Sequence, residues 1–331
     1  MPDYVALARA AGCEAAVLEW LAANEEIAAG LPDLRAADWP RRRRAARELA
    51  DVLATRFTLP GPAGCVVTEH RVPVRSGEVT VLRYHPPGDD RPRPAHLSVH
   101  GGGFIGGDVH EVINDRLLRR RAVDSGFDIF DIDYRLAPEH PFPAGLEDCV
   151  DVLGWLAASA AELGIDAGRL GVGGASAGGN LAALAAVHLR DAGGPPLDHQ
   201  VLEVPAASLY LDRDGSFREH GVLADFGDFA EIRAAYLGAD PAPGPAAPAE
   251  VRDLAGLPPA LVLTAECDPL RDCGEAYAAR LAAAGVPVET WRAPRQVHGS
   301  AGITATSPIA REWQDRVSGF LRARRTAATV H

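Results

Sequence analysis

A serine set between small residues is the strongest chemical signal in this sequence. Residues 174–178 read Gly-Ala-Ser-Ala-Gly, which fits the pattern G-x-S-x-G around Ser176. The preceding segment RLGVGGAS is typical of a strand, and the following NLAALAAVHL is typical of a helix. Such a strand-to-helix turn lifts a serine hydroxyl to the edge of a sheet. A glycine-rich turn without chemistry is the alternative in a chain with 34 Gly, but this context favours a nucleophile.

A second glycine-rich segment lies upstream of the serine. The residues HGGGF at 100–104 overlap the end of the predicted strand AHLSVHG. Glycines let backbone N–H groups approach an anion closely, and ester hydrolysis creates a tetrahedral oxyanion. Losing one such donor costs about 3 kcal/mol of barrier. We assign the N–H groups of Gly102, Gly103 and Ala177 to an oxyanion hole, with a flexible loop as the alternative.

The serine needs a base, and the base needs a carboxylate that orients it. In chain order the acid follows the serine and precedes the histidine. Asp268 ends the strand-like segment ALVLTAECD and is followed by Pro269, which places it in a loop. Glu266 and Asp272 are rivals, but Glu266 is predicted to lie within the strand and Asp272 to start a helix.

His298 is the predicted base among 11 His. It follows the last predicted strand in the short loop RQVHGS, before a closing helix. His188 lies within a predicted helix, and His199 opens a strand at the wrong edge. A loop histidine without chemistry is the weaker alternative.

The elements around these residues alternate between strand and helix. After two N-terminal helices at 14–29 and 38–56, a hairpin is predicted at 65–74 and 78–86. Further strands are predicted at 95–101, 127–134, 169–176, 199–205, 260–268 and 286–294. Helices are predicted at 146–163, 177–190, 274–284 and 309–322.

This alternation predicts an α/β fold with a mostly parallel sheet that helices cover on both faces. The opening hairpin makes the sheet mixed. Residues 206–257 contain a predicted helix near 223–237 and a Pro-rich run, but no clear strand. We expect this insertion and residues 1–60 to form a helical cap on a catalytic domain of residues 61–331, since sites lie at the carboxyl edge of such sheets.

Composition and charge limit the classes of binding partner and the cellular compartment that we expect for this protein. The net charge is −12 and no Lys is present, so nucleic acid is a poor partner. The run at 41–44 is four consecutive Arg, which we interpret as the solvated start of a helix and not as a nucleic-acid or membrane patch. The five scattered Cys have no metal-ligand spacing and suit a reducing compartment. The absence of a signal-peptide pattern and of a long apolar run leads us to expect a cytoplasmic protein without a membrane span.

Several segments in order resemble the bacterial hormone-sensitive lipase family of α/β-hydrolases. They are HGGGF at 100–104, DYRLAPEHPFPA at 133–144, GASAGGNLAA at 174–183, CDPLRD at 267–272 and VHG at 297–299. The resemblance spans residues 65–325. It implies an α/β-hydrolase fold, hydrolysis of carboxylic esters with short to medium acyl chains, and no metal or organic cofactor. It also implies that His100 shapes the oxyanion loop, that residues 133–135 brace the carboxyl edge, and that the protein is a monomer or a homodimer.

Three positions depart from the family pattern. Ala175 stands where the family usually has Asp, Arg295 where it often has Gly, and Ser300 where an aromatic residue follows His-Gly. None of the three belongs to the predicted triad, so we expect chemistry to survive and substrate fit to differ.

These observations predict a serine esterase that acts through an acyl-enzyme, with Ser176, His298 and Asp268 as its triad. The same residues would also serve acyl transfer or the closing and opening of a lactone, because both use the same triad. A ligand-binding protein on the same scaffold is a third reading, but such proteins typically lose the nucleophile or the base, and both are present here.

Overall fold

A mixed β-sheet organises the molecule. The computed structural model describes residues 3–88, 92–211, 215–221, 223 and 229–326. Within them the sheet has eight strands in the order β1-β2-β4-β3-β5-β6-β7-β8. The strands are β1 (Val66–Val74), β2 (Gly77–His85), β3 (Arg93–Val99), β4 (Asp128–Asp133), β5 (Ile165–Ala175), β6 (His199–Glu203), β7 (Ala260–Ala265) and β8 (Val288–Ala293).

The strand directions confirm the predicted mostly parallel, mixed sheet. β1 and β2 form an antiparallel hairpin, and β2 pairs antiparallel with β4. Every later pairing, from β4 through β3 to β8, is parallel. The carboxyl ends of β3, β5, β6 and β7 therefore share one edge, which is where the predicted site residues follow their strands.

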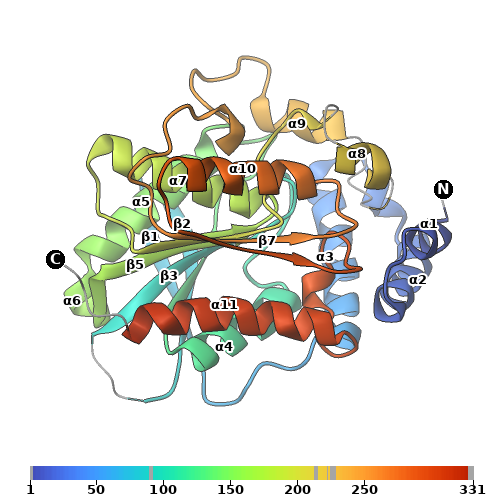
Figure 1. Ribbon diagram of the computed structural model, residues 1–331, viewed down its shortest axis with the longest axis horizontal. Helices are drawn as coiled ribbons and strands as arrows, with labels where there is room; N and C mark the ends of the chain where they lie inside the picture. Colours follow the sequence, from blue (N-terminus) through green and yellow to red (C-terminus); the bar gives the residue numbers. More distant parts are fainter. Residues whose placement is uncertain (1–2, 89–91, 212–214, 222, 224–228, 327–331) are drawn as a thin grey trace.

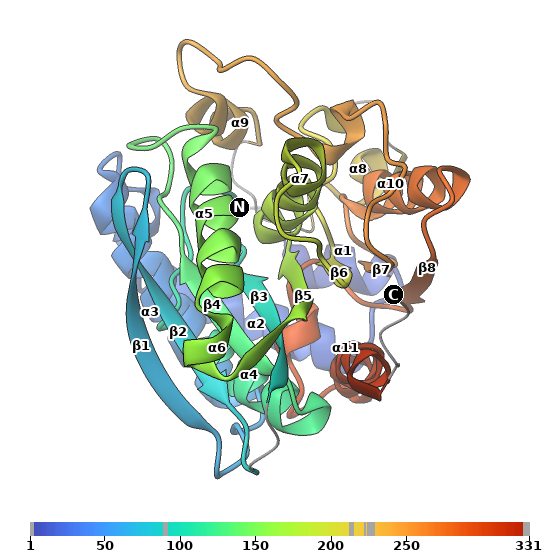
Figure 2. The same cartoon turned by 90° about the vertical axis from the view of Figure 1, so that its left-hand side faces the viewer.

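Helices cover both faces of the sheet, as Figures 1 and 2 show. One face carries α5 (Ala144–Ala158), α7 (Ala177–Ala192) and α10 (Arg271–Ala283), and the other carries α4 (Val112–Ser125) and α11 (Pro308–Thr326). Both faces are buried, which explains why β7, with the sequence ALVLTA, is almost continuously apolar instead of alternating.

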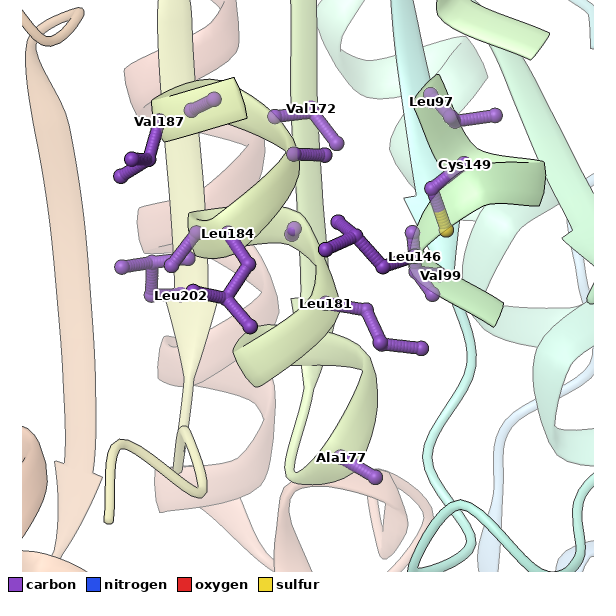
Figure 3. Packing of buried hydrophobic residues seen from close by; sticks show 14 of the residues in the cluster. Leu97, Val99, Leu146, Cys149, Val172, Ala177, Leu181, Leu184, Val187 and Leu202 are labelled. Atoms are coloured by element: carbon purple, nitrogen blue, oxygen red, sulfur yellow. The ribbon is translucent and has the colours of Figure 1, made fainter. Parts of the chain in front are cut away.

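The larger core lies between the sheet and the helices α5 and α7. Figure 3 shows Leu184 and Val187 of α7 on the side of Leu202 of β6, and Leu181 on the opposite side, toward Val99 of β3. All of them belong to one buried cluster with Val172 of β5. Burying a side chain of this size contributes about 1.5–3 kcal/mol. This packing fixes the start of α7, and with it the turn at Ser176, against the sheet.

The N-terminal helices lie at the edge of the sheet toward which β7 points (Figure 1). They are α1 (Tyr4–Ala10), α2 (Ala15–Ala29) and α3 (Trp39–Phe57), with the short helix η1 (Pro32–Arg35) between the last two. Asp38 caps α3 by accepting a hydrogen bond from the N–H of Arg41 at 2.9 Å. The three helices share a separate apolar cluster with Cys267, Val297 and Ile303, so they pack on the loops around the predicted acid and base.

Several elements differ from the sequence expectation. The single helix expected at 146–163 is divided at Ser159 into α5 and α6 (Ala160–Leu163). The expected helix at 223–237 is α9 (Phe229–Leu237), and residues 224–228 lie outside the described residues. Among the described residues, the short helices that were not predicted are α1, η1, α8 (Gly215–His220), η3 (Pro248–Glu250) and η4 (Ser300–Gly302), and the longer α4 was not predicted either. No helix in the described part of the chain is long and apolar enough to cross a membrane.

Candidate active site

The turn at Ser176 is sterically constrained. Ser176 lies between β5 and α7 with φ 57° and ψ −117°, a conformation that a side-chain-bearing residue rarely adopts. A Cβ added at Gly174 would lie 2.5 Å from the Val99 oxygen, and one at Gly178 would lie 2.0 Å from the same oxygen. The motif's two glycines are therefore required by the close approach of β3, and the strained serine is held half-buried at the sheet edge.

The three residues predicted as a triad lie in one hydrogen-bonded chain. The Oγ atom of Ser176 is 3.0 Å from Nε2 of His298, and Nδ1 of His298 is 2.8 Å from Oδ2 of Asp268. Asp268 is fully buried, and its Oδ1 accepts a hydrogen bond from the N–H of Leu270 at 2.8 Å. The order and spacing suit proton transfer from the serine to the imidazole, with the carboxylate fixing the ring.

The loop that carries His298 is held by its own residues. Gly299 has φ 81°, a left-handed conformation that glycine adopts without strain. The Ser300 hydroxyl donates to the Val297 carbonyl at 2.7 Å and accepts from the Val297 N–H at 3.2 Å. Arg295, where the resemblance suggests Gly, has φ 57° and is therefore strained. The departures at 295 and 300 thus lie in the turn that orients the imidazole.

The rival acids have other partners. Glu266 follows β7 directly instead of lying within it, and its Oε2 accepts from the N–H of Arg295 at 2.6 Å. Asp272 lies in the first turn of α10 and accepts from the N–H of Ser216 at 2.8 Å. Neither contacts His298 in the described structure, so Asp268 alone of the three candidates holds the imidazole.

The predicted oxyanion loop begins where β3 ends. Gly102 and Gly103 have φ 116° and 63°, and a Cβ at Gly102 would lie 2.1 Å from the Gly106 oxygen. Among the described residues, no group accepts a hydrogen bond from the N–H groups of Gly102, Gly103 or Ala177. Ala177 is the first residue of α7 (Figure 3), so its N–H also carries the positive end of the helix dipole. These donors remain available for an anion.

His100 braces this loop and does not contact the nucleophile. Its Nδ1 lies 2.8 Å from the Gly101 carbonyl oxygen, and burial lowers the pKa of its imidazole. The ring stacks on Tyr134 with centroids 4.4 Å apart, and the Tyr134 hydroxyl donates to the His100 carbonyl at 3.1 Å. Arg135 is held in turn by the buried carboxylate of Asp148 at 2.9 Å. Burial raises the pKa of Asp133 to about 6.

Sequence analysis missed a buried ion pair next to Ser176. Glu203 ends β6, its backbone carbonyl accepts from the Ser176 N–H at 2.9 Å, and its carboxylate binds Arg121 through two contacts of 2.7 Å. The indole N–H of Trp313 donates to the same carboxylate at 2.6 Å. The only sequence signal is a Glu among the apolar residues VLEVP that end the predicted strand HQVLEVP.

Arg43 was also missed, because the whole run at 41–44 was interpreted as solvated. Its Nε donates to the carbonyl of Ile105 at 2.7 Å, and Nη2 donates to that of Ala137 at 2.7 Å. Nη2 also lies 2.6 Å from Glu139. Arg43 thus links α3 to the segment that follows the oxyanion glycines. Arg41, by contrast, pairs with Asp33 at the surface.

Metal ligation has no candidate cluster within the described residues: no group of three or more His, Cys, Asp or Glu side chains could hold an ion. His188 is exposed on α7 and His199 is buried at the amino end of β6, away from the carboxyl edge.

Comparisons with known proteins bear on the fold and the family of this chain. A family model described as the alpha/beta hydrolase fold matches residues 96–301. The esterase LipI of Mycobacterium tuberculosis is 39% identical over 250 residues, which are 73% of this chain and 77% of that relative. The carboxylesterase NlhH of the same organism is 42% identical over 245 residues, 71% of this chain and 75% of that relative. The hyperthermophilic esterase from the archaeon Pyrobaculum calidifontis has a TM-score of 0.80 and 35% identity, covering 88% of this chain and 95% of that one.

Proposed function

This chain belongs to the bacterial hormone-sensitive lipase family of α/β-hydrolase carboxylesterases, and from that premise we propose that Ser176, His298 and Asp268 are its catalytic triad. The observation that carries the proposal is the continuous chain of contacts from Ser176 Oγ through the imidazole to the buried carboxylate. The enzyme hydrolyses carboxylic esters, and we propose which residues carry out the reaction and which acyl chain lengths it prefers.

The proposed reaction has two steps. As Ser176 Oγ attacks the ester carbonyl carbon, its proton passes to Nε2 of His298, and the resulting imidazolium is stabilised by Asp268. The tetrahedral intermediate collapses when the imidazolium gives its proton to the leaving alcohol, which leaves an acyl-serine. Water deprotonated by His298 then attacks this ester and releases the carboxylic acid.

The oxyanion of each tetrahedral intermediate is proposed to accept hydrogen bonds from Gly102, Gly103 and Ala177. Their N–H groups have no acceptor among the described residues, so no internal hydrogen bond must break before they bind the oxyanion. Preorganised donors of this kind contribute about 3 kcal/mol each to lowering the barrier.

Residues 1–60 and 206–257 are proposed to form a cap that limits acyl-chain length. A methyl group added at Gly103 would lie 3.5 Å from Ile232 of α9, and one at Gly299 would lie 3.6 Å from the indole of Trp20 of α2. Apolar side chains from both segments thus lie beside the oxyanion loop and beside the base. This proximity supports a preference for short to medium acyl chains.

Replacing Ser176 with Ala tests the proposal. We expect kcat for p-nitrophenyl butyrate to fall by roughly 10³-fold or more, because the nucleophile is lost while the fold remains. Ser159→Ala, in the break between α5 and α6, is the matched control and should retain full turnover. A series of p-nitrophenyl esters with increasing acyl length should show a falling kcat/KM beyond medium chains.

A fluorophosphonate probe distinguishes activity that arises from Ser176 from activity of a contaminating esterase. The probe should modify the wild-type protein at Ser176 and leave the Ser176→Ala protein unmodified, as seen in intact mass. Undiminished turnover or labelling in that variant would overturn the triad.

A further inference from the structure

A cleft lies beside α4 and α11, which are the two helices on the face of the sheet opposite α7 (Figures 1 and 2). These two helices pack side by side, and Leu59 and Thr304 close the cleft between them. Its volume is about 130 Å³. One water occupies about 30 Å³ in the liquid, so the cleft accommodates a ligand of only a few heavy atoms.

The cleft concentrates positive charge in an acidic protein. Arg116, Arg120 and Arg311 line it together with a single carboxylate, that of Asp315. The chain as a whole carries a net charge of −12. A local excess of guanidinium groups between low-dielectric walls attracts small anions that the remaining surface repels.

Two of these arginines retain unused donors. Arg116 is occupied, since its Nη1 donates to carbonyls at the end of α3, including that of Thr58 at 2.5 Å. In the described structure, Arg120 makes no hydrogen bond and only a 3.9 Å ion pair with Asp124. Arg311 makes one hydrogen bond, from Nη1 to the Thr304 carbonyl. The guanidinium groups of Arg120 and Arg311 can therefore bind a planar two-oxygen group.

The uncharged part of the lining consists of two leucines together with Thr304 and Gln314. The two leucines are Leu59, which follows α3 and is 37% exposed, and Leu117 of α4. Apolar side chains next to paired donors favour a ligand with one charged end and a short hydrocarbon tail. A dianion such as phosphate would leave the leucines without a partner and would face Asp315 with greater repulsion.

We propose that this cleft binds a small aliphatic monocarboxylate, with its carboxylate between Arg120 and Arg311. The tail lies against Leu59 and Leu117. Carboxylic acids of this class are also what ester hydrolysis releases, so the ligand can arise from the enzyme's own reaction. The site uses none of the residues of the proposed triad, and binding does not depend on them.

Calorimetric titration of the full chain with sodium butyrate at constant ionic strength tests the site. We expect saturable binding, and we expect Arg120→Gln to raise Kd about tenfold because one charge-assisted contact is lost. Asp315→Asn should lower Kd, since it removes the like charge. Arg316→Gln is the control: Arg316 lies on α11 but pairs with Glu312 outside the cleft, so Kd should not change.

The variants also guard against a folding artefact. Arg120 donates no hydrogen bond within the described residues, so the melting temperature of Arg120→Gln should match that of the wild type. Absence of saturable binding to the wild type, or an unchanged Kd in Arg120→Gln, would overturn the proposal. Titration with sodium phosphate tests the charged end of the ligand alone, and titration with n-butanol tests the hydrocarbon tail alone. If either binds as tightly as butyrate or more tightly, the monocarboxylate assignment is wrong.

Discussion

Ala175, directly before Ser176, stands where the family resemblance suggests Asp, and the structure gives a physical reason why Ala fits there. Ala175 of β5 is in register with Glu203 of β6, so their side chains lie on the same face of the sheet. The Glu203 carboxylate is buried and fully engaged by Arg121 and Trp313. A buried carboxylate is thus already present beside position 175, supplied by the neighbouring strand.

Introducing Asp at position 175 should therefore be unfavourable. Two carboxylates would share Arg121 in a buried site, where like charges cost several kcal/mol unless one is neutralised. We expect Ala175→Asp to lower the free energy of unfolding in urea by about 2–3 kcal/mol. In the double variant with Glu203→Gln the loss should be smaller than the sum of the two single losses, by at least about 1 kcal/mol.

Ala175→Asn is the matched control for size and polarity. If Ala175→Asp and Ala175→Asn are equally destabilised, repulsion from Glu203 is not the cause.

At the scale of elements, α3 reaches the oxyanion loop through one side chain. Arg43 donates to carbonyls at Ile105 and Ala137, two segments that are far apart from it in sequence. Ile105 comes two residues after Gly103, and its own N–H donates to the Gly102 carbonyl. The geometry of the proposed oxyanion donors therefore depends on the position of α3.

Arg43→Gln should therefore affect turnover more than binding. The loop would lose charge-assisted hydrogen bonds worth about 1.5–3 kcal/mol each before solvent screening. We expect kcat for p-nitrophenyl butyrate to fall about tenfold with a smaller change in KM. Arg41→Gln, from the same run of arginines, removes only a surface pair with Asp33 and should leave kcat unchanged. Equal effects of the two substitutions would contradict the positioning role of Arg43.

The elements that sequence patterns predicted are those with strong periodicity or clear ends. The strands of the sheet and the helices α2, α3, α7 and α11 lie within a few residues of their expected ranges. The helix α4 was not assigned, because its sequence VINDRLLRRRAVDS is dominated by charge. Only Leu118 and Ala122 of its apolar side chains are buried against the sheet, so its apolar stripe is too narrow to stand out.

At the scale of the whole molecule, the mostly parallel, mixed sheet with helices on both faces followed from the alternation of strands and helices, but the order of its strands did not. Contacts between distant segments did not follow either. The Glu14 carboxylate accepts from the Gln296 amide at 2.8 Å and binds the Ser307 hydroxyl, which ties the start of α2 to the loop before His298. Nothing in local sequence marks such a pair, because its partners meet only after the chain has folded.

The packing of α3 against α4 also buries Glu111, and the buried carboxyl group lowers the stability of the folded protein at neutral pH. Burial raises the pKa of Glu111 from the usual 4.5 to about 7, with Asp51 and Asp108 adding repulsion and Arg47 partly offsetting it. The folded protein therefore holds this proton where the unfolded chain releases it. The resulting stabilisation is complete below pH 4.5 and is lost as pH rises through 7.

Glu111→Gln removes this titration and should reverse its effect on stability. Relative to the wild type, the variant should gain unfolding free energy as pH rises from 5 to 8, by up to about 3 kcal/mol. Urea unfolding of both proteins at several pH values measures the difference. Glu26→Gln, at an exposed position of α2, is the control and should track the wild type at every pH. If the unfolding free energies of Glu111→Gln and the wild type change in parallel with pH, Glu111 ionises in the folded protein as readily as in the unfolded chain. Its burial between α3 and α4 would then not cause the pH dependence.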